Sequence, residues 1–279
     1  MVLQNIQHII GIILIIYGNN CNDCQATPLY GRDVRLAENN EFPFVVSLSL
    51  KSNNIESEKN HFCGGSLITY SHVLTAEHCV INKLHYYDLV IKVGSIDLRN
   101  TSIYRVAWWI TYNQWNVNYN DDEKIGNTSH DIAIIKLYGN VYSSIKLGIL
   151  TRFPDKDLYG KKAETAGWGR TEVKKPARYL RTVELFTLQP EKYLFKNFIN
   201  DTAFQNNFFT EKFLMSSAKP PAYLGCGDSG SPLLINKREI IGVNKGTCCL
   251  VNDTSTINYQ NLHSSVNYYI RYINDVINL

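Results

Sequence analysis

Gly227-Asp228-Ser229-Gly230-Ser231-Pro232 is the stretch that decides how this sequence folds and what chemistry it offers. Glycine adopts backbone conformations that other residues avoid, so Gly227 and Gly230 permit a sharp, exposed turn around Ser229. We expect the backbone N–H groups of Gly227 and Ser229 to face one point, where they can stabilise a developing negative charge. Because Gly-Asp-Ser-Gly is also a common turn composition, the interpretation needs support from elsewhere in the chain.

A serine hydroxyl becomes a nucleophile when an imidazole accepts its proton and a carboxylate fixes the tautomer of that imidazole. His78 is the candidate imidazole, in the segment Leu74–Cys79. Cys79 follows Cys63 by sixteen residues, so a disulfide between them is expected to anchor the turn that carries His78. Asp131 lies directly before a strand-like apolar run, where a carboxylate can be buried against the imidazole.

The bulk composition is that of an ordinary globular protein. The chain has 279 residues, of which 44% are hydrophobic and 19% charged, enough to bury one large core or two smaller ones. The formal net charge of +3 is too small to indicate a nucleic acid or a membrane surface as the partner. No internal repeat, long linker or low-complexity tract divides the chain.

The N-terminus has the features of a secretory signal peptide. Ile9–Tyr17 is an apolar run too short to cross a bilayer, which takes about 20 residues, but as long as a signal-peptide core. The pattern allows cleavage after Gly18 or after Ala26, so we predict a signal peptide within residues 1–26. The run is preceded by no Lys or Arg, and a buried N-terminal strand is the alternative interpretation.

Two further features favour export to the extracellular space. Four Asn-x-Ser/Thr triplets are candidate N-glycosylation sites, at Asn100, Asn127, Asn200 and Asn252. The seven cysteines show no zinc-finger spacing with matching histidines, so disulfides formed in an oxidising compartment are expected. We therefore predict a secreted glycoprotein that contains disulfides.

Short strand-like runs recur along the chain, bounded by turn-forming residues. Phe44–Leu50 alternates apolar and polar residues, so one of its faces is predicted to be buried. The other runs are Leu89–Val93, Ile132–Leu137, Ala163–Gly167, Pro232–Ile235 and Glu239–Val243. Only the last dozen residues show a helical period, with one apolar stripe formed by Val266, Tyr269, Ile270, Ile273, Val276 and Ile277. The pattern predicts an all-β sandwich or barrel with a terminal helix.

The three motifs resemble those of the chymotrypsin-like serine peptidases, in a style similar to secreted arthropod members of the family. His78, Asp131 and Ser229 follow one another in the family's order. Further matching segments are Glu41–Leu48 and Ala166–Gly169. The resemblance covers a peptidase domain over residues 29–279. It implies two antiparallel six-stranded β-barrels with a C-terminal α-helix and the three residues in the cleft between the barrels.

Carried over residue by residue, the resemblance implies a role for each position. His78 would be the general base and later the acid, Asp131 would orient it, and Ser229 would be the nucleophile. Gly227 and Ser229 would supply the oxyanion N–H groups, and Asp228 would pair with the α-amino group freed by zymogen cleavage. The resemblance further implies protein or peptide substrates, protein protease inhibitors as partners, a monomer, and no metal or organic cofactor.

The expected activation segment departs from the family. Its zymogens are cut after Arg or Lys, before a start that resembles Ile-Val-Gly-Gly. The nearest match here is Leu29-Tyr30-Gly31-Arg32, with no basic residue before it. We expect a short activation segment within residues 27–35. An x-Pro dipeptidase that removes Thr27-Pro28 would expose Leu29 as the new N-terminus. Cleavage after Arg32 or Arg35 would instead expose Asp33 or Leu36.

The residues expected in the specificity pocket also depart from the family. Either Tyr223 or Leu224 stands about six residues before the nucleophile, where a trypsin-like enzyme carries Asp. The substrate-binding strand, usually Ser-Trp-Gly, reads Asn244-Lys245-Gly246, and Ile257 stands near the place of a pocket-wall glycine. This crowded apolar pocket predicts cleavage after small or apolar residues and not after Arg or Lys.

Two more departures concern the general base and the cysteines. Glu77 stands beside the candidate base, where the family usually has alanine. The resemblance pairs Cys226 with either Cys248 or Cys249, which leaves one odd thiol once Cys21 and Cys24 leave with the signal peptide.

The leading hypothesis is an active secreted serine endopeptidase, because the triad and both oxyanion positions are intact. The alternative is a catalytically weak homologue that acts as a secreted binding or regulatory protein. The unusual activation segment, Glu77 and the crowded pocket favour that alternative. A third hypothesis, an unrelated secreted β-protein, requires every motif to match by chance.

Overall fold

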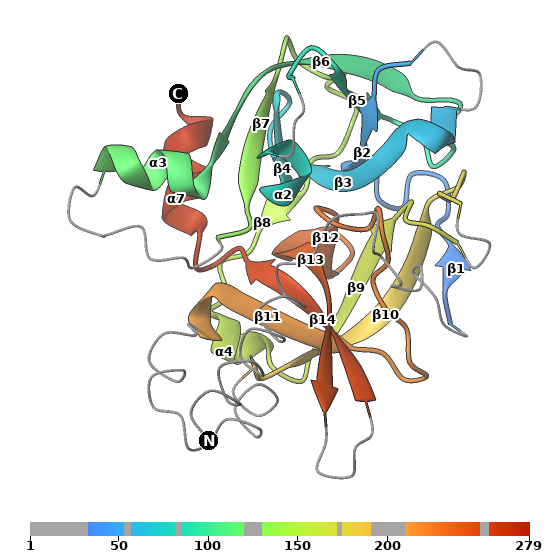
Figure 1. Ribbon diagram of the computed structural model, residues 1–279, viewed down its shortest axis with the longest axis vertical. Helices are drawn as coiled ribbons and strands as arrows, with labels where there is room; N and C mark the ends of the chain where they lie inside the picture. The colour runs from blue at the N-terminus through green and yellow to red at the C-terminus, as the bar shows by residue number, and fades with distance from the viewer. Residues whose placement is uncertain are drawn as a thin grey trace, which may run out of the picture.

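The computed structural model describes residues 33–52, 57–81, 85–119, 130–171, 175–190, 210–251 and 257–279 (Figure 1). The predicted signal peptide and most of the activation segment lie outside these ranges. The candidate glycosylation sites Asn127, Asn200 and Asn252 lie outside them too, whereas Asn100 is exposed in a turn. Domain boundaries around the N-terminus therefore stay a prediction.

The first half of the chain forms a closed antiparallel barrel of six strands, in the order β2-β3-β4-β7-β6-β5. It is the upper barrel in Figure 1. Its strands are β2 (Val45–Leu50), β3 (His61–Leu67), β4 (His72–Thr75), β5 (Leu89–Val93), β6 (Ser102–Thr111) and β7 (Ala133–Leu137). Apolar residues at alternate positions of each strand point to the same face of the sheet. Closing the sheet into a barrel buries that face in the interior.

The second half forms a second barrel below the first, in the order β9-β10-β11-β14-β13-β12, and it closes because β12 pairs with β9. Its strands are β9 (Lys162–Gly167), β10 (Arg181–Leu188), β11 (Phe213–Ser217), β12 (Pro232–Ile235), β13 (Glu239–Val251) and β14 (Ile257–Ser265). The short strands β1 (Arg35–Leu36) and β8 (Ile149–Leu150) pair with β10 and β13. Two six-stranded antiparallel barrels are the expected fold, and the expectation is confirmed.

The C-terminal helix α7 (Ile270–Ile277) packs on the first barrel although it follows the last strand of the second (Figure 1). Four residues of the predicted apolar stripe are buried and two, Ile270 and Ile277, are half-buried. The Tyr272 hydroxyl donates to the Ile110 carbonyl at 2.6 Å. Trp115 of helix α3 (Tyr112–Tyr119) contacts Tyr272 edge to face, with 5.7 Å between the ring centroids. The helix therefore links the end of the chain to the opposite half of the fold.

The other helical segments of the described residues are short: α2 (His78–Ile81), α4 (Asp155–Leu158), and the 3-10 turns η1 (Ser57–Asn60) and η2 (Thr210–Lys212). Within the described ranges, no helix combines the length and the apolar character needed to cross a membrane.

Candidate active site

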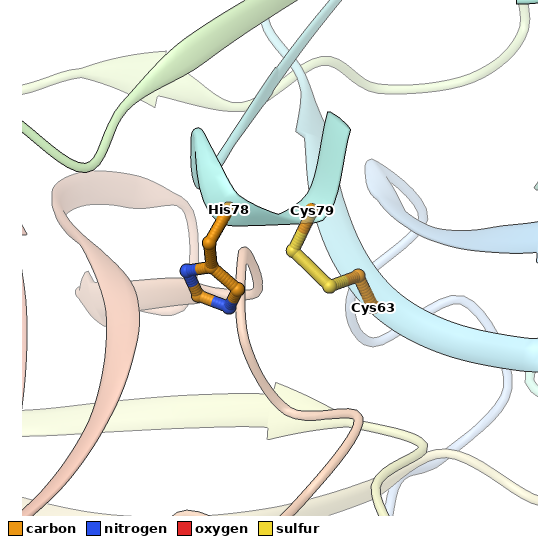
Figure 2. Close-up of side chains that lie close together, drawn as sticks. All are labelled: Cys63, His78 and Cys79. Carbon is orange, nitrogen blue, oxygen red and sulfur yellow. A yellow bond between two sulfur atoms is a disulfide. The ribbon is translucent and has the colours of Figure 1, made fainter. Parts of the chain in front are cut away.

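His78 lies at the start of α2, a single helical turn that faces the junction of the two barrels (Figure 1). The expected disulfide joins Cys79 on this turn to Cys63 on β3, so the prediction of that bridge is confirmed. Figure 2 shows the imidazole and the disulfide projecting from the same short helix. The bridge limits the movement of α2 relative to the barrel and so fixes the position of the imidazole.

His78, Cys63 and Cys79 also bring three potential metal-binding atoms within 4.8 Å of one another. Both sulfur atoms are used in the disulfide (Figure 2). A cysteine binds zinc or a similar ion through its thiolate, which a disulfide does not offer. The chemistry of this donor set therefore does not fit a metal site.

Asp131 lies against His78, as its position before β7 predicted. The Nδ1–H group of His78 donates to Asp131 Oδ2 at 2.8 Å and lies 3.0 Å from Oδ1, and the backbone N–H of His78 donates to Oδ1 at 3.0 Å. Burial raises the pKa of Asp131, but the charge of His78 and the hydrogen bonds from it outweigh burial and hold that pKa well below its usual range. Because the carboxylate only accepts, Nδ1 carries a proton, and Nε2 is the ring nitrogen that does not face Asp131.

Ser229 lies on the turn that the two glycines were expected to form. Gly227 and Gly230 have φ angles of 96° and 80°, in the left-handed region that favours glycine. The Gly64 N–H of β3 donates to the Ser229 carbonyl at 2.7 Å, so the turn of the second barrel is tied to the first. The half-buried Ser229 hydroxyl donates a long hydrogen bond of 3.4 Å to the Lys245 carbonyl.

Two backbone N–H groups of this turn are unsatisfied among the residues that the structure describes. The N–H groups of Asp228, Gly230 and Ser231 donate to backbone carbonyls, whereas those of Gly227 and Ser229 have no partner there. Unpaired backbone donors are uncommon in folded proteins, and a pair of them beside a serine can bind an anionic oxygen.

Asp228 is buried with 1% of its surface exposed, and its carboxylate lies against the segment around Gly169. Oδ1 accepts from the Gly169 N–H at 2.9 Å and Oδ2 from the Gly225 N–H at 3.0 Å. A side chain at Gly169 would overlap this carboxylate, so the Gly-Trp-Gly segment noted in the sequence is explained by the close approach of Asp228.

His61 is a residue whose role the sequence did not indicate. Its Nδ1 lies 2.8 Å from the Ser47 hydroxyl, and its Nε2 donates to the Gly227 carbonyl at 3.0 Å. Burial lowers its pKa to about 4, so the ring is neutral and can bridge a hydroxyl donor and a carbonyl acceptor. This bridge from the first barrel orients the peptide unit that precedes the Ser229 turn.

Glu77 is buried beside His78, with 9% of its surface exposed. Burial raises its pKa to about 7, although it accepts hydrogen bonds of 3.1 Å from the Asn113 amide. Lys245 is buried nearby, its Nζ lies 5.2 Å from the centre of the Phe213 ring, and burial lowers its pKa. The negative charges of Asp131 and Glu77 oppose that lowering, so a cation and two carboxyls share this side of the site.

The expected pocket residues lie around Leu224, which is 2% exposed. Asn261 on β14, which the sequence did not indicate, accepts from the Leu224 N–H at 2.9 Å and donates to the Ala222 carbonyl at 3.3 Å. The Thr247 hydroxyl donates to the Leu224 carbonyl at 2.8 Å. Tyr223 is half-buried, and Gly246 has open space where a side chain would start.

Ile257 does not lie with the other expected pocket residues along the β13–β14 hairpin. It pairs with Val251, whereas Asn244 pairs with His263. The six positions from Ile257 to His263 correspond to roughly 20 Å along a strand. Cys226 is disulfide-bonded, and the side chains of its two expected partners, Cys248 and Cys249, lie outside the described part of the chain.

Comparison with known proteins gives the family of the chain. A model of the family described as Trypsin matches residues 33–273. The chain belongs to the trypsin family. Granzyme M of Rattus norvegicus is 30% identical over 208 residues, which cover 72% of each chain. Hypodermin-A of Hypoderma lineatum is 28% identical over 220 residues, covering 75% of this chain and 74% of that protein.

A solved structure has the same fold as this trypsin-family chain. It is described as neuropsin, a serine protease expressed in the limbic system of mouse brain. The TM-score is 0.65 with 20% identity, and the match covers 88% of this chain and 98% of that one. The relatives come from insects and mammals alike, so family membership by itself does not select an arthropod type.

Proposed function

We propose that the protein is a secreted serine endopeptidase that hydrolyses peptide bonds through an acyl-enzyme. The observation that carries the proposal is the hydrogen-bonded pair of His78 and the buried Asp131, set at the barrel junction where the Ser229 turn is tied down. A buried, charged carboxylate is costly unless it serves an interaction, and here it orients an imidazole. Retention of the whole pair argues against the alternative of a merely binding homologue.

The proposed reaction uses groups that all belong to the chain. Ser229 Oγ attacks the substrate carbonyl carbon while His78 Nε2 takes the hydroxyl proton, and Asp131 stabilises the imidazolium. The free N–H groups of Gly227 and Ser229 hydrogen-bond the oxyanion. His78 then protonates the departing amine, and the C–N bond breaks to leave an ester on Ser229. A water molecule, deprotonated by His78, hydrolyses that ester and restores the hydroxyl.

We propose a preference for small or apolar residues before the cleaved bond. Neither residue expected at the key position, Tyr223 or Leu224, carries a carboxylate that could pair with Arg or Lys, and the Asn261 amide is already bonded to the Leu224 backbone. A buried guanidinium without a partner is strongly disfavoured. The insect and mammalian relatives include a chymase of Cavia porcellus and trypsin theta of Drosophila melanogaster, so their names do not choose the preference.

The test compares peptide substrates that differ only at the residue before the cleaved bond. The processed protein should hydrolyse substrates with Ala, Val or Leu there at least tenfold faster, by kcat/KM, than those with Arg or Lys. His78→Ala should abolish both activities. Faster hydrolysis of the Arg substrate would overturn the proposed preference, and equal activity of His78→Ala would overturn the mechanism.

Export and activation belong to the same proposal. We propose secretion as an N-glycosylated, arthropod-type monomer and activation by exposure of Leu29, whose new α-amino group would pair with Asp228. N-terminal sequencing of the secreted protein should give Leu29 as the first residue. A start at Asp33 or Leu36 would instead support cleavage after Arg32 or Arg35, and would reject the Leu29 route.

A further inference from the structure

A network of buried polar side chains crosses the second barrel and ends at the serine turn. It consists of Ser216 on β11, His263 on β14, Asn244 on β13 and Thr165 on β9, each at most 1% exposed. The four strands belong to the lower barrel in Figure 1. Buried polar groups are costly unless they are hydrogen-bonded, so the partners of each group decide what the network does.

The hydrogen bonds of this network have one consistent direction, which is set by the Asp228 carbonyl. A carbonyl only accepts, so the Asn244 side chain presents its Nδ2–H₂ group to that oxygen, at 3.3 Å. The Oδ1 atom of Asn244 then faces His263 Nδ1 at 2.8 Å, so Nδ1 carries the proton. Nε2 of the same ring accepts from the Ser216 hydroxyl at 2.8 Å.

Every polar side-chain atom of the network has a partner. Asn244 Nδ2 also donates to the Thr165 hydroxyl at 2.8 Å, and that hydroxyl donates to the Pro232 carbonyl at 2.8 Å. Burial lowers the pKa of His263 to about 3, so the ring is neutral at physiological pH and keeps one donor and one acceptor nitrogen. The network is rigid, because the movement of one side chain would break several hydrogen bonds.

Asn244 is the member that bonds the serine turn, and it does so with both its backbone and its side chain. Its carbonyl accepts from the Gly230 N–H at 2.7 Å, and its N–H donates to the Ser231 carbonyl at 2.8 Å. Its side chain adds the bond to the Asp228 carbonyl. Two of these three bonds hold the peptide units on either side of Ser229.

The bond to the Asp228 carbonyl bears directly on the proposed oxyanion donor. The Asp228 carbonyl and the Ser229 N–H belong to one planar trans peptide unit, so they point in opposite directions. A side chain that fixes the direction of the carbonyl therefore fixes the direction of the N–H as well. The hydrogen bond that the carbonyl accepts also polarises the peptide unit and makes its N–H a stronger donor.

We propose that Asn244 and His263 are positioning residues that hold the Ser229 N–H toward the oxyanion formed in the reaction. Asn244 orients the peptide unit, and His263 orients the Asn244 amide by donating to its Oδ1. The inference rests on the proposed endopeptidase function and adds two residues that act through the Ser229 peptide unit. A hydrogen bond that strengthens in the transition state contributes to kcat and not to KM.

The first test measures kcat and KM of the processed protein on an apolar peptide substrate. Asn244→Leu removes the side-chain donor and should lower kcat about ten- to hundredfold with KM within about twofold, since loss of a whole oxyanion donor costs about 10²- to 10³-fold in kcat. The matched control is Thr187→Val, which removes a buried hydroxyl that donates to the Leu158 carbonyl in the same barrel. Its kcat should stay within about twofold of the parent. An equal loss of kcat in the control, or a loss confined to KM, would overturn the proposal.

A pair of substitutions at His263 separates positioning from packing. The side-chain amide of asparagine places an N–H donor near the position of Nδ1, whereas that of glutamine reaches the position of Nε2. His263→Asn should therefore keep kcat within about threefold of the parent, and His263→Gln should lower it about tenfold. Thermal melting of each variant should show a folded protein at the assay temperature. Equal losses in both variants would show that only the volume of the ring matters and would overturn the role of His263.

A second measurement does not depend on activity. Asp228-Ser229 is the one Asp-Ser pair in the sequence, so labelling aspartate with ¹³C at the carbonyl carbon and serine with ¹⁵N gives one resonance for this peptide unit. Loss of the hydrogen bond in Asn244→Leu should move the Asp228 carbonyl carbon upfield, and His263→Asn should leave it near its parental position. An unmoved resonance in Asn244→Leu would overturn the positioning. A parent without turnover would reject the endopeptidase function, and the resonance would still decide the positioning.

Discussion

At the scale of single residues, the site depends on a carboxylate that stays charged although it is buried. Asp131 is 6% exposed, and the charge of His78, the hydrogen bonds from it and the charge of Lys245 keep the pKa of Asp131 low against the effect of burial. A lone buried charge would cost several kcal/mol, so the pair is stable only as a unit. Removing the charge should therefore affect catalysis through the tautomer and orientation of His78.

Asp131→Asn should lower kcat/KM for an apolar peptide substrate about 10³- to 10⁴-fold at neutral pH. The amide can donate to Nδ1 and so favours the wrong tautomer, while its size leaves the geometry intact. Asp97→Asn, which removes a surface carboxylate paired with Arg178, is the matched control and should keep near-parental activity. A loss of less than tenfold in Asp131→Asn would contradict the assigned role.

Glu77 should make stability depend on pH. Its pKa is about 7 when folded and near 4.5 when unfolded, so the folded state holds a proton that the unfolded state releases between these values. The free energy of unfolding therefore falls as the pH rises from about 4.5 to about 7, by up to about 3 kcal/mol. Glu77→Gln should lose this slope and melt at a higher temperature than the parent above pH 7, but not below pH 4.5. Parallel melting curves at all pH values would contradict this.

Sequence reasoning predicted that His78 and Asp131 lie together and that glycines shape the turn at Ser229, because the residue types and their neighbours are distinctive. The His78–Asp131 contact and the glycine turn at Ser229 are both seen. It did not find His61 or Asn261. Their side chains form hydrogen bonds with backbone groups of Gly227 and Leu224, which are far away in sequence. It expected Ile257 beside the pocket, whereas the backbone of the β13–β14 hairpin pairs Ile257 with Val251 and pairs Asn244 with His263. The register of a hairpin cannot be counted reliably from a short run of residues.

At the scale of elements, the serine turn depends on close packing between β3 and the loop before β12. A side chain at Gly230 would overlap the Gly64 carbonyl and the Thr75 hydroxyl, and its φ of 80° adds backbone strain. The same loop is held by the hydrogen bond from Gly230 N–H to the Asn244 carbonyl at 2.7 Å.

Gly230→Ala should lower the free energy of unfolding by about 1–3 kcal/mol, measured by urea denaturation. Gly246→Ala is the matched control, because that glycine has no atom within 4 Å of the added methyl group. Its change should stay below about 1 kcal/mol. Equal effects of the two substitutions would show that packing at Gly230 is not the cause.

Strand positions were largely predictable because alternation of apolar residues is a local signal. Leu89–Val93 and Pro232–Ile235 match the observed strands end to end. β13 runs on to Val251, beyond the predicted end at Val243, because its outer part pairs with β14 and needs no further core residues. Closure into barrels came from the family resemblance, since alternation alone fits a sandwich as well.

At the scale of the whole molecule, the C-terminal helix joins the two halves. Ile273 is fully buried in the core cluster that contains the first barrel and residues of the second. Ile273→Ala should therefore destabilise the fold by about 2–5 kcal/mol and leave a single unfolding transition. Asn274→Ala, on the exposed face of the same helix, should change stability by less than about 1 kcal/mol. Two separate transitions in Ile273→Ala would show that the barrels unfold independently.

The central claim is that Ser229 is a nucleophile activated by His78 and Asp131. The most direct measurement is labelling of the processed, secreted protein with a fluorophosphonate, followed by mass spectrometry of its peptides. We predict one adduct, on Ser229, that is lost in Ser229→Ala and strongly reduced in His78→Ala. Absence of an adduct on Ser229 in correctly processed protein, or an adduct on another serine, would contradict the claim.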